Sequence, residues 1–175
     1  MWGTPILDPL AVWIAAAWLG VLMLHAGLTK AFDRLQFVQH LGAYRVPDGW
    51  IWPMSLLLPV AELLCGALLL TPWRAAAAVA CGALLLLYAV AMAWHRAAGR
   101  QLDCGCGGEP LPLSWALVAR NVLLLPVCWT AAAPMAEREL RWADQAVVLG
   151  AVLLGALLWA AFHQVLRQVR RTSTV

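Results

Sequence analysis

Charge is scarce in this sequence. Only 12% of its 175 residues are charged and 63% are hydrophobic, whereas charged residues make up about 25% of a typical soluble domain. The apolar residues fall in long blocks, not in the narrow stripes of amphipathic helices. This composition excludes an ordinary soluble domain and indicates a polytopic membrane protein, whose first partner is the lipid bilayer. The net charge of +3 is too small to indicate a nucleic-acid partner.

The sequence also lacks the marks of a signal peptide and of a linker. A signal peptide begins with a positively charged region, but no basic residue precedes Lys30, and no small-residue cleavage site leads into a soluble domain. No Ser-rich or Gly-rich stretch and no repeat of fixed period divides the chain. We therefore expect residues 1–175 to form a single integral membrane domain that keeps its first apolar block as a helix.

Five apolar blocks are long enough to cross the hydrocarbon core, which takes about 20 helical residues. We predict transmembrane helices at approximately 10–29, 51–70, 75–94, 113–133 and 145–166. Tryptophans stand at the block edges, where an aromatic belt belongs: Trp50, Trp52, Trp73, Trp94, Trp115 and Trp142. The expected fold class is therefore all-α, a polytopic transmembrane helix bundle.

Five crossings place the loops on two sides of the membrane. Side B holds the loop 30–50, the cysteine loop 95–112 and the C-terminal tail; side A holds the N-terminus and the connections 71–74 and 134–144. Side B carries 8 basic residues: Lys30, Arg34, Arg45, Arg96, Arg100, Arg167, Arg170 and Arg171. Side A carries 3: Arg74, Arg138 and Arg141. The positive-inside rule places side B in the cytoplasm, although the balance without the tail is only 5 to 3.

The polar loop 95–112 carries Cys104 and Cys106, separated by Gly105. A disulfide needs Cα atoms about 4.4–6.8 Å apart. An extended Cys-Gly-Cys segment lies near the upper limit, and the glycine permits a tighter turn. A strained disulfide of this kind is more oxidising and exchanges readily. The motif therefore predicts a redox-active dithiol held at the membrane surface.

Two other interpretations of the loop stay open. Cys104 and Cys106 can be ordinary loop cysteines with no chemical role. They can also bind copper(I) or zinc, because thiolates favour soft metals, with His95 as a further ligand. Two cysteines without a second pair make a poor structural zinc site.

Two ionisable residues lie inside predicted helices, where such groups are costly and usually paired or functional. Measured from side B, Glu62 and Arg120 lie about 17 and 11 Å deep at 1.5 Å per residue, so we predict an ion pair between them. His25 and His95 lie near the same end of their helices. The cluster either locks the bundle together, or it tunes the thiols through a nearby cation or binds a lipid headgroup or a quinone. No cofactor is certain from the sequence.

The three remaining cysteines, Cys65, Cys81 and Cys128, fall at a similar depth near side A, about 8–9 Å into their helices. Such a group can form a second dithiol that passes electrons towards the loop. It can equally be core packing, since cysteine is a small hydrophobe.

Four stretches resemble the MauE family of methylamine-utilisation membrane proteins, within the wider DoxX-like group. They are residues 24–30 (LHAGLTK) leading to Tyr44-Arg45-Val46-Pro47, residues 58–66 (LPVAELLCG), residues 102–108 (LDCGCGG) and residues 113–121 (LSWALVARN). Together they cover about residues 20–125. Gly108 stands where the family often has an aromatic residue.

The resemblance implies a four-helix DoxX/MauE-like core, to which a fifth, C-terminal transmembrane helix is added. It implies a multi-pass protein of the bacterial inner membrane that helps to mature a disulfide-rich periplasmic protein, the methylamine dehydrogenase small subunit, beside a thioredoxin-like partner. Cys104 and Cys106 would then act as a thiol–disulfide pair facing the periplasm, with Glu62 and Arg120 in support. The alternatives are a non-enzymatic membrane subunit of a redox complex and a protein that handles copper or zinc.

Overall fold

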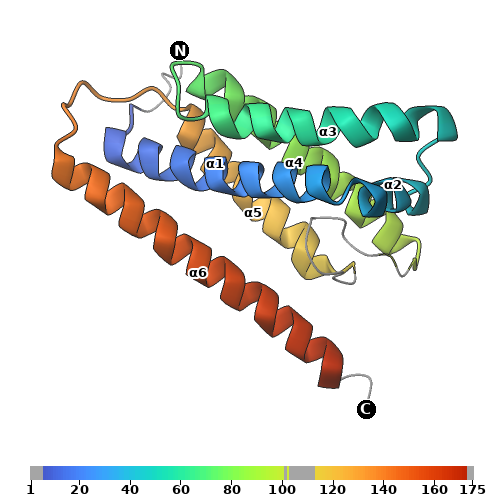
Figure 1. The fold of residues 1–175 in the computed structure, drawn as a ribbon. Coiled ribbons are helices and arrows are strands. Elements are labelled where there is room, and N and C mark those ends of the chain that lie inside the picture. The colour runs from blue at the N-terminus through green and yellow to red at the C-terminus, as the bar shows by residue number, and fades with distance from the viewer. Residues whose placement is uncertain (1–5, 101, 103–112, 173–175) are drawn as a thin grey trace.

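The computed structural model describes residues 6–100, 102 and 113–172, which are helical apart from their connections and an isolated bridge between Leu7 and Met135 (Figure 1). Six helices follow one another: α1 Pro9–Phe32, α2 Arg34–Ala43, α3 Asp48–Leu68, α4 Arg74–Ala97, α5 Trp115–Ala132 and α6 Trp142–Thr172. All but α2 are long and apolar enough to cross a membrane. The predicted all-α polytopic bundle with five transmembrane helices is confirmed.

Helix α1 starts where the sequence provides a cap and ends later than its apolar block. The Asp8 side chain accepts a hydrogen bond from the Leu10 N–H at 2.8 Å, and Pro9 suits the first helical position because it needs no N–H partner there. The helix continues to Phe32, where the Asp33 N–H donates to the Thr29 carbonyl at 3.0 Å. Lys30 therefore belongs to the last turn of α1 and not to a loop.

The loop predicted over residues 30–50 contains a helix that the sequence did not reveal. Asp33 accepts from the Gln36 N–H at 3.2 Å and so caps α2. This ten-residue helix buries Phe37 and Leu41, and its other residues are half-buried or exposed. Because it is short and packs against α3 and α1, it lies at the end of the bundle instead of crossing it.

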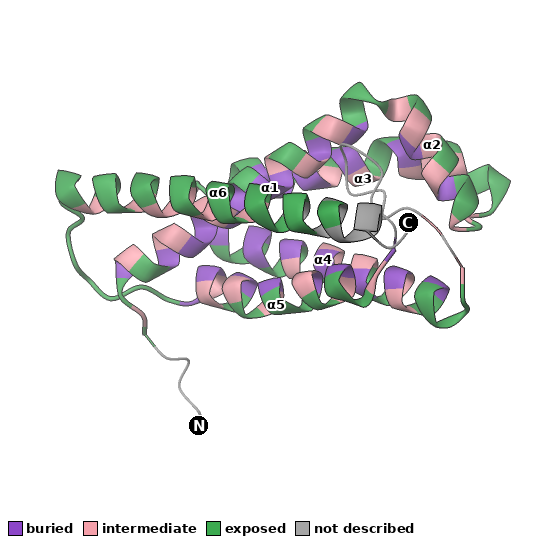
Figure 2. Cartoon of the chain, turned by 90° about the horizontal axis from the view of Figure 1, so that it is seen from below, coloured by how far each residue is buried: buried purple, intermediate pink, exposed green. Residues whose placement is uncertain are grey.

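Helix α1 is the centre of the bundle, since it contacts each of the other five helices. It packs most closely along α3, while α4 packs along α5. Figure 2 shows the buried faces of these helices turned toward one another. One core cluster joins side chains of α1, α3, α4 and α5, among them Leu19, Met23, Cys81 and Leu124.

Glycines allow α1 and α3 to approach closely. A methyl group added at Gly66 would lie 2.8 Å from Leu24 Cγ and 3.0 Å from the Gly20 carbonyl oxygen. One added at Gly27 would lie 2.8 Å from Leu63 Cγ and 3.0 Å from the carbonyl oxygen of Pro59. Small residues at such crossings let membrane helices pack backbone to backbone.

This close packing predicts that Gly66→Ala destabilises the bundle by about 1–3 kcal/mol, because overpacking must push α1 and α3 apart. The thermal unfolding midpoint of the purified protein in detergent measures the effect. Gly42→Ala is the matched control, since a methyl group at Gly42 meets nothing within 4 Å. Equal midpoints for the two variants would contradict the tight contact.

An arginine joins α4 to α5 at side A. Arg74 begins α4, and its guanidinium donates to the carbonyl oxygens of Ala131 and, at 3.0 Å, Ala133. These carbonyls lie at the C-terminal end of α5, where helical partners run out. The side chain is buried and serves as a C-terminal cap for the neighbouring helix.

Helix α6 packs against α1 at the edge of the bundle, and its described side chains are largely exposed (Figures 1 and 2). Its start is tied down by Arg138, which bridges Asp8 at 2.9 Å and Asp144 at 2.6 Å. The hydrogen bond and charge of Asp144, followed by the charge of Asp8, raise the pKa of Arg138. Further along, Trp159 meets Trp18 of α1 edge to face, with ring centroids 6.2 Å apart. The expected four-helix core with an added C-terminal helix is therefore found.

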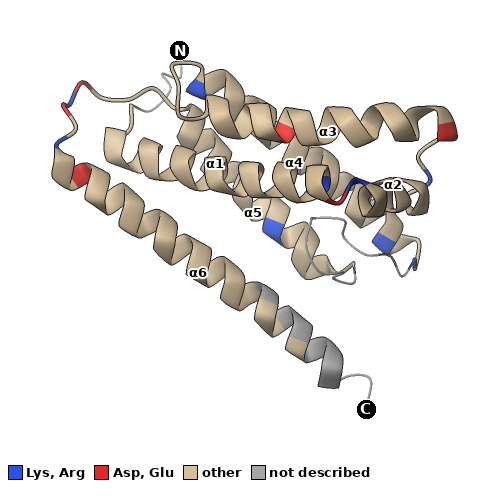
Figure 3. Ribbon diagram, viewed as in Figure 1, with Lys and Arg blue, Asp and Glu red and all other residues tan. Residues whose placement is uncertain are grey.

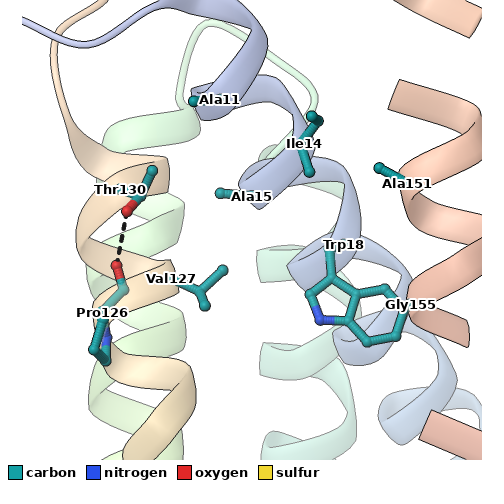
Figure 4. A pocket seen from close by; sticks show the side chains of 9 residues that line it. All are labelled: Ala11, Ile14, Ala15, Trp18, Pro126, Val127, Thr130, Ala151 and Gly155. Atoms are coloured by element: carbon teal, nitrogen blue, oxygen red, sulfur yellow. Dashed lines mark hydrogen bonds between the residues drawn. The ribbon is translucent and has the colours of Figure 1, made fainter. Parts of the chain in front are cut away.

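A pocket of about 410 Å³ lies between α1, α5 and α6 (Figure 4). Its lining includes Trp18, Val127 and Gly155 and no charged side chain. The Thr130 hydroxyl donates to the Pro126 carbonyl at 3.0 Å and is therefore already satisfied. The pocket has the lining of an apolar contact surface rather than of a polar ligand site.

Candidate functional site

The cysteine loop is anchored at both ends to the side B end of α4 and α5. Cys104 and Cys106 themselves lie outside the described residues. The Leu113 N–H donates to the Leu102 carbonyl at 2.7 Å, so the two ends of the loop are joined. Leu113 is buried in a small apolar cluster with Met92 and Leu117, against which Leu102, Tyr44, Tyr88 and Val118 pack. The loop therefore leaves and rejoins the bundle at one place.

His95, the proposed third metal ligand, already has partners within the protein. It lies buried in the last turn of α4, and its ring meets Tyr44 edge to face with centroids 4.8 Å apart. Its Nδ1 lies 3.1 Å from Arg100 Nη1, and the ring also hydrogen-bonds the Tyr44 backbone. These contacts favour a role in holding the segment after α2 against α4. Within residues 6–100, 102 and 113–172, no group of three or more His, Cys, Asp or Glu side chains is placed to hold a metal ion.

A buried ion pair lies next to Tyr88, which packs against the cluster that holds Leu102 and Leu113. Glu62 of α3 has no exposed surface, and Lys30 of α1 is only 5% exposed. Lys30 Nζ donates to both carboxylate oxygens of Glu62, at 2.7 and 2.9 Å. The Tyr88 hydroxyl of α4 donates to Glu62 Oε1 at 2.7 Å. One carboxylate thus links three helices, and among the described residues no buried side-chain nitrogen or oxygen lacks a hydrogen-bond partner.

Tyr88 connects this network to the loop. Its ring packs against the apolar cluster that anchors Leu102 and Leu113, while its hydroxyl reaches Glu62. Lys30 Nζ also lies 5.4 Å from the centre of the Tyr88 ring, within the range of a cation–π contact. Of the polar cluster expected beneath the cysteine loop, only Glu62 belongs to this network, and Lys30 and Tyr88 are its other members.

The predicted ion pair between Glu62 and Arg120 is wrong. Arg120 donates from Nε and Nη2 to the side-chain oxygen of Asn121, at 3.3 and 3.1 Å, and its guanidinium lies 4.9 Å from the centre of the Trp159 ring. It thus reaches toward α6, while Glu62 is satisfied by Lys30. His25 is exposed and stands outside the cluster as well. Glu62 and Arg120 lie at comparable depths along their helices, but their side chains lie on helix faces that do not meet.

Sequence reasoning missed Lys30 and Tyr88, although helical spacing points to both. Lys30 follows Met23 and Gly27 at intervals of four and three residues, so it continues the buried face of α1. Tyr88 lies seven residues after Cys81 and seven before His95, which are buried on α4. Figure 3 shows how few charges lie along the middle of the helices, which makes a charge on a buried face a strong signal.

The three helix cysteines meet in the core, at the depth that the sequence indicated. Cys65, Cys81 and Cys128 are free, buried and members of the same core cluster. They come from α3, α4 and α5, respectively. They form a second group of oxidisable side chains that is distinct from the loop.

The sequence is similar to one family of known membrane proteins. Residues 8–134 match the family described as methylamine utilisation protein MauE. A protein of that name from Paracoccus denitrificans is 38% identical over 124 residues, covering 68% of this chain and 67% of the relative. A protein of the same name from Paracoccus versutus is 36% identical over 131 residues, covering 72% of this chain and 70% of the relative. A third, from Methylophilus methylotrophus, is 31% identical over 110 residues, covering 61% of this chain and 58% of the relative. No solved structure matches. With its first five helices inside the matched region, the chain belongs to the MauE family.

Proposed function

We propose that this protein takes part in methylamine utilisation as a multi-pass protein of the bacterial inner membrane, where Cys104 and Cys106 exchange disulfides with protein partners. Membership of the MauE family supports a role in methylamine utilisation, since the relatives above are named after that process. The observation that carries the chemistry is the anchoring of the loop. Its ends, Leu102 and Leu113, are hydrogen-bonded to each other and pack with Tyr88, whose hydroxyl reaches Glu62, and this supports a cysteine motif presented from one end of the bundle.

In the proposed reaction the oxidised loop pair donates its disulfide. A thiolate of the client protein attacks one loop sulfur, the Cys104–Cys106 bond breaks, and a mixed disulfide forms. A second client thiolate then displaces the loop thiolate, so the client gains a disulfide and the loop becomes a dithiol. Two electrons have moved from client to loop. A thioredoxin-like partner in its disulfide form returns the loop to its oxidised state by the same exchange.

The proposed client is a disulfide-rich periplasmic protein, such as the small subunit of methylamine dehydrogenase. Such a client needs several disulfides to form and rearrange in an oxidising compartment. A membrane-anchored disulfide donor is suited to this task because its thiols stay at the surface where the client folds. This assignment requires side B to face the periplasm.

The distribution of charge favours a second candidate function. Lys30 and Arg74 are buried with partners, so they carry no information about topology. Without them and without the tail, side B keeps four basic residues and side A keeps two: Arg34, Arg45, Arg96 and Arg100 against Arg138 and Arg141. A cytoplasmic loop would hold reduced thiols, which suit the binding of copper(I) or zinc.

Thiol labelling in intact cells tests the proposal. The full chain is used with Cys65, Cys81 and Cys128 replaced by alanine, so that only the loop thiols can react. A membrane-impermeant maleimide is applied before and after treatment with a reductant. We expect labelling only after reduction, because the oxidised pair would face the periplasm.

The same experiment distinguishes the second candidate. Labelling that appears only after the inner membrane is opened, and that needs no reductant, would overturn disulfide delivery to the periplasm. A matched variant that also carries Cys104→Ser and Cys106→Ser sets the background. Bound copper or zinc that disappears with the loop cysteines would then identify metal handling.

A further inference from the structure

Arg34 begins α2 at the side B end of the bundle, and its side chain reaches across to α3. Its guanidinium carbon lies 3.9 Å from the centre of the Trp52 ring. Nε and Nη2 both donate to the Ser55 hydroxyl oxygen, at 3.4 and 3.2 Å. The buried Ser55 hydroxyl in turn donates to the Trp52 carbonyl at 2.8 Å. Contact with the ring and hydrogen bonds along one edge therefore hold the guanidinium group in a fixed orientation.

No carboxylate balances the charge of this arginine. In the part of the chain that the structure describes, Arg34 forms no salt bridge, and its hydrogen bonds to Ser55 leave Nη1 without an acceptor. The adjacent acid, Asp33, accepts instead from the Gln36 N–H at 3.2 Å. A guanidinium group that is held in place by neutral partners and keeps one nitrogen open is ready to bind an anion.

Large apolar side chains are exposed close to this cation. Phe32 and Leu35, on either side of Arg34 in the sequence, are 87% and 73% exposed. Trp50 and Trp52, near the start of α3, are also mostly exposed. Such a patch is unfavourable in water, whereas the interface of a bilayer accommodates tryptophan at the headgroups and buries phenylalanine and leucine. This end of α2 and α3 therefore lies where lipid headgroups meet acyl chains.

The combination of a fixed cation with exposed apolar side chains favours a phospholipid over a free phosphate ion. The planar guanidinium group matches the geometry of a phosphate, whether free or in a headgroup. A free ion would meet only the cation, but a phospholipid also brings acyl chains to the apolar side chains. A headgroup with a net negative charge is favoured further, because no carboxylate offsets the charge of Arg34.

We propose that Arg34, Trp52 and Ser55 form a binding site for one anionic phospholipid. Nη1 of Arg34 donates to a phosphate oxygen of the headgroup, while Trp52 and Ser55 position the guanidinium group. The acyl chains contact Phe32 and Leu35. The bound lipid thereby holds α2 against the membrane. The site does not depend on the chemistry of the cysteine loop or on which side of the membrane the loop faces.

Native mass spectrometry of the full chain tests the proposal by counting bound lipid. The protein is purified in detergent, freed of lipid and titrated with phosphatidylglycerol or with phosphatidylcholine, whose headgroup has no net charge. We expect one phosphatidylglycerol to bind more tightly than phosphatidylcholine does. Arg34→Gln should weaken that binding by about tenfold or more, because a hydrogen bond between two charged groups is lost. Arg96→Gln is the matched control, since Arg96 is exposed at the same end of the bundle and its loss should change the affinity little.

Two further measurements decide the outcome if Arg34→Gln does not fold. Trp52→Leu replaces an exposed side chain and keeps it apolar, but it removes the ring that holds the guanidinium group, so it should also weaken binding. Inorganic phosphate should not displace the lipid beyond the effect of chloride at the same ionic strength. Equal affinities for the two lipids, equal losses in Arg34→Gln and Arg96→Gln, or natural affinity in Trp52→Leu would each overturn the proposal. Displacement by inorganic phosphate would overturn it as well, by assigning the site to a free ion.

Discussion

A Lys30→Met variant should unfold far more readily than the natural protein, because it leaves the Glu62 carboxylate without its counter-ion inside the bundle. Both oxygens of Glu62 accept from Lys30 Nζ, at 2.7 and 2.9 Å, and the side chain has no exposed surface. Removing one member of a buried ion pair costs about 3–5 kcal/mol. The unfolding midpoint in detergent and the yield from membranes measure the effect.

Removing both members of the pair provides the control. A Lys30→Met/Glu62→Met double variant should recover much of the lost stability, because two apolar side chains replace the pair and no charge is stranded. Tyr88→Phe should cost less than Lys30→Met, about 1.5–3 kcal/mol for one hydrogen bond to a charged group. If Lys30→Met were as stable as the natural protein, the pair would not hold the bundle together.

Coupling energies from double-mutant cycles distinguish the observed pair, Lys30 and Glu62, from the pair that the sequence predicted, Arg120 and Glu62. Lys30 and Glu62 should show a large coupling energy, since each loses its partner when the other is replaced. Arg120 and Glu62 should show almost none, because Arg120 contacts Asn121 and Trp159. Coupling of similar size in both cycles would contradict the structure.

The five transmembrane helices were predictable because the hydropathy of a segment indicates whether lipid or water surrounds it. A run of about 20 apolar residues has few alternatives to a membrane helix, since its backbone groups must be satisfied within the segment. The same reasoning cannot find α2, whose ten residues bury only Phe37 and Leu41 and whose other faces are polar or exposed. Its visible signal is the capping residue Asp33.

The partner of Glu62 was not predictable from hydropathy and depth alone. Depth along a helix follows from counting residues, but pairing depends on which face each residue occupies and on how the helices are arranged. Glu62 and Arg120 met the first condition and failed the second. Lys30 was assigned to a loop because the apolar block ended at Thr29, although α1 continues through it to Phe32. The error therefore lies at a helix boundary.

The positions of the helix cysteines show what can be predicted from the depth of a residue along its helix. Their distances from the helix ends indicated a common level near side A, and the structure brings all three into one core cluster. Which neighbours each cysteine meets depends in addition on how α3 and α5 pack against α4. Whether these cysteines are redox-active stays a prediction.

Replacing either loop cysteine should abolish the proposed activity while leaving the protein in the membrane. Serine keeps the size and polarity of the side chain but removes the nucleophilic sulfur, so neither Cys104→Ser nor Cys106→Ser can close the loop disulfide. We expect cells that carry either variant to lose growth on methylamine and to accumulate a client that lacks its disulfides. Immunoblots of membranes should show natural amounts of the variant, because Leu102 and Leu113 hold the two ends of the loop. Cys128→Ser, deep in the core, is the control for a general effect of cysteine loss.

The two single variants should differ from each other in a way that a structural role for the loop cannot reproduce. During reoxidation, one loop thiolate attacks the disulfide of the thioredoxin-like partner, and the other loop cysteine then displaces the partner and closes the loop disulfide. If only the second cysteine is replaced, the loop cannot resolve the mixed disulfide with the partner, which should appear as a larger species on a non-reducing gel. Replacing the attacking cysteine, or both, should remove that species. Natural growth with either single variant, or no trapped species in any of them, would mean that the loop thiols do not exchange disulfides with a partner.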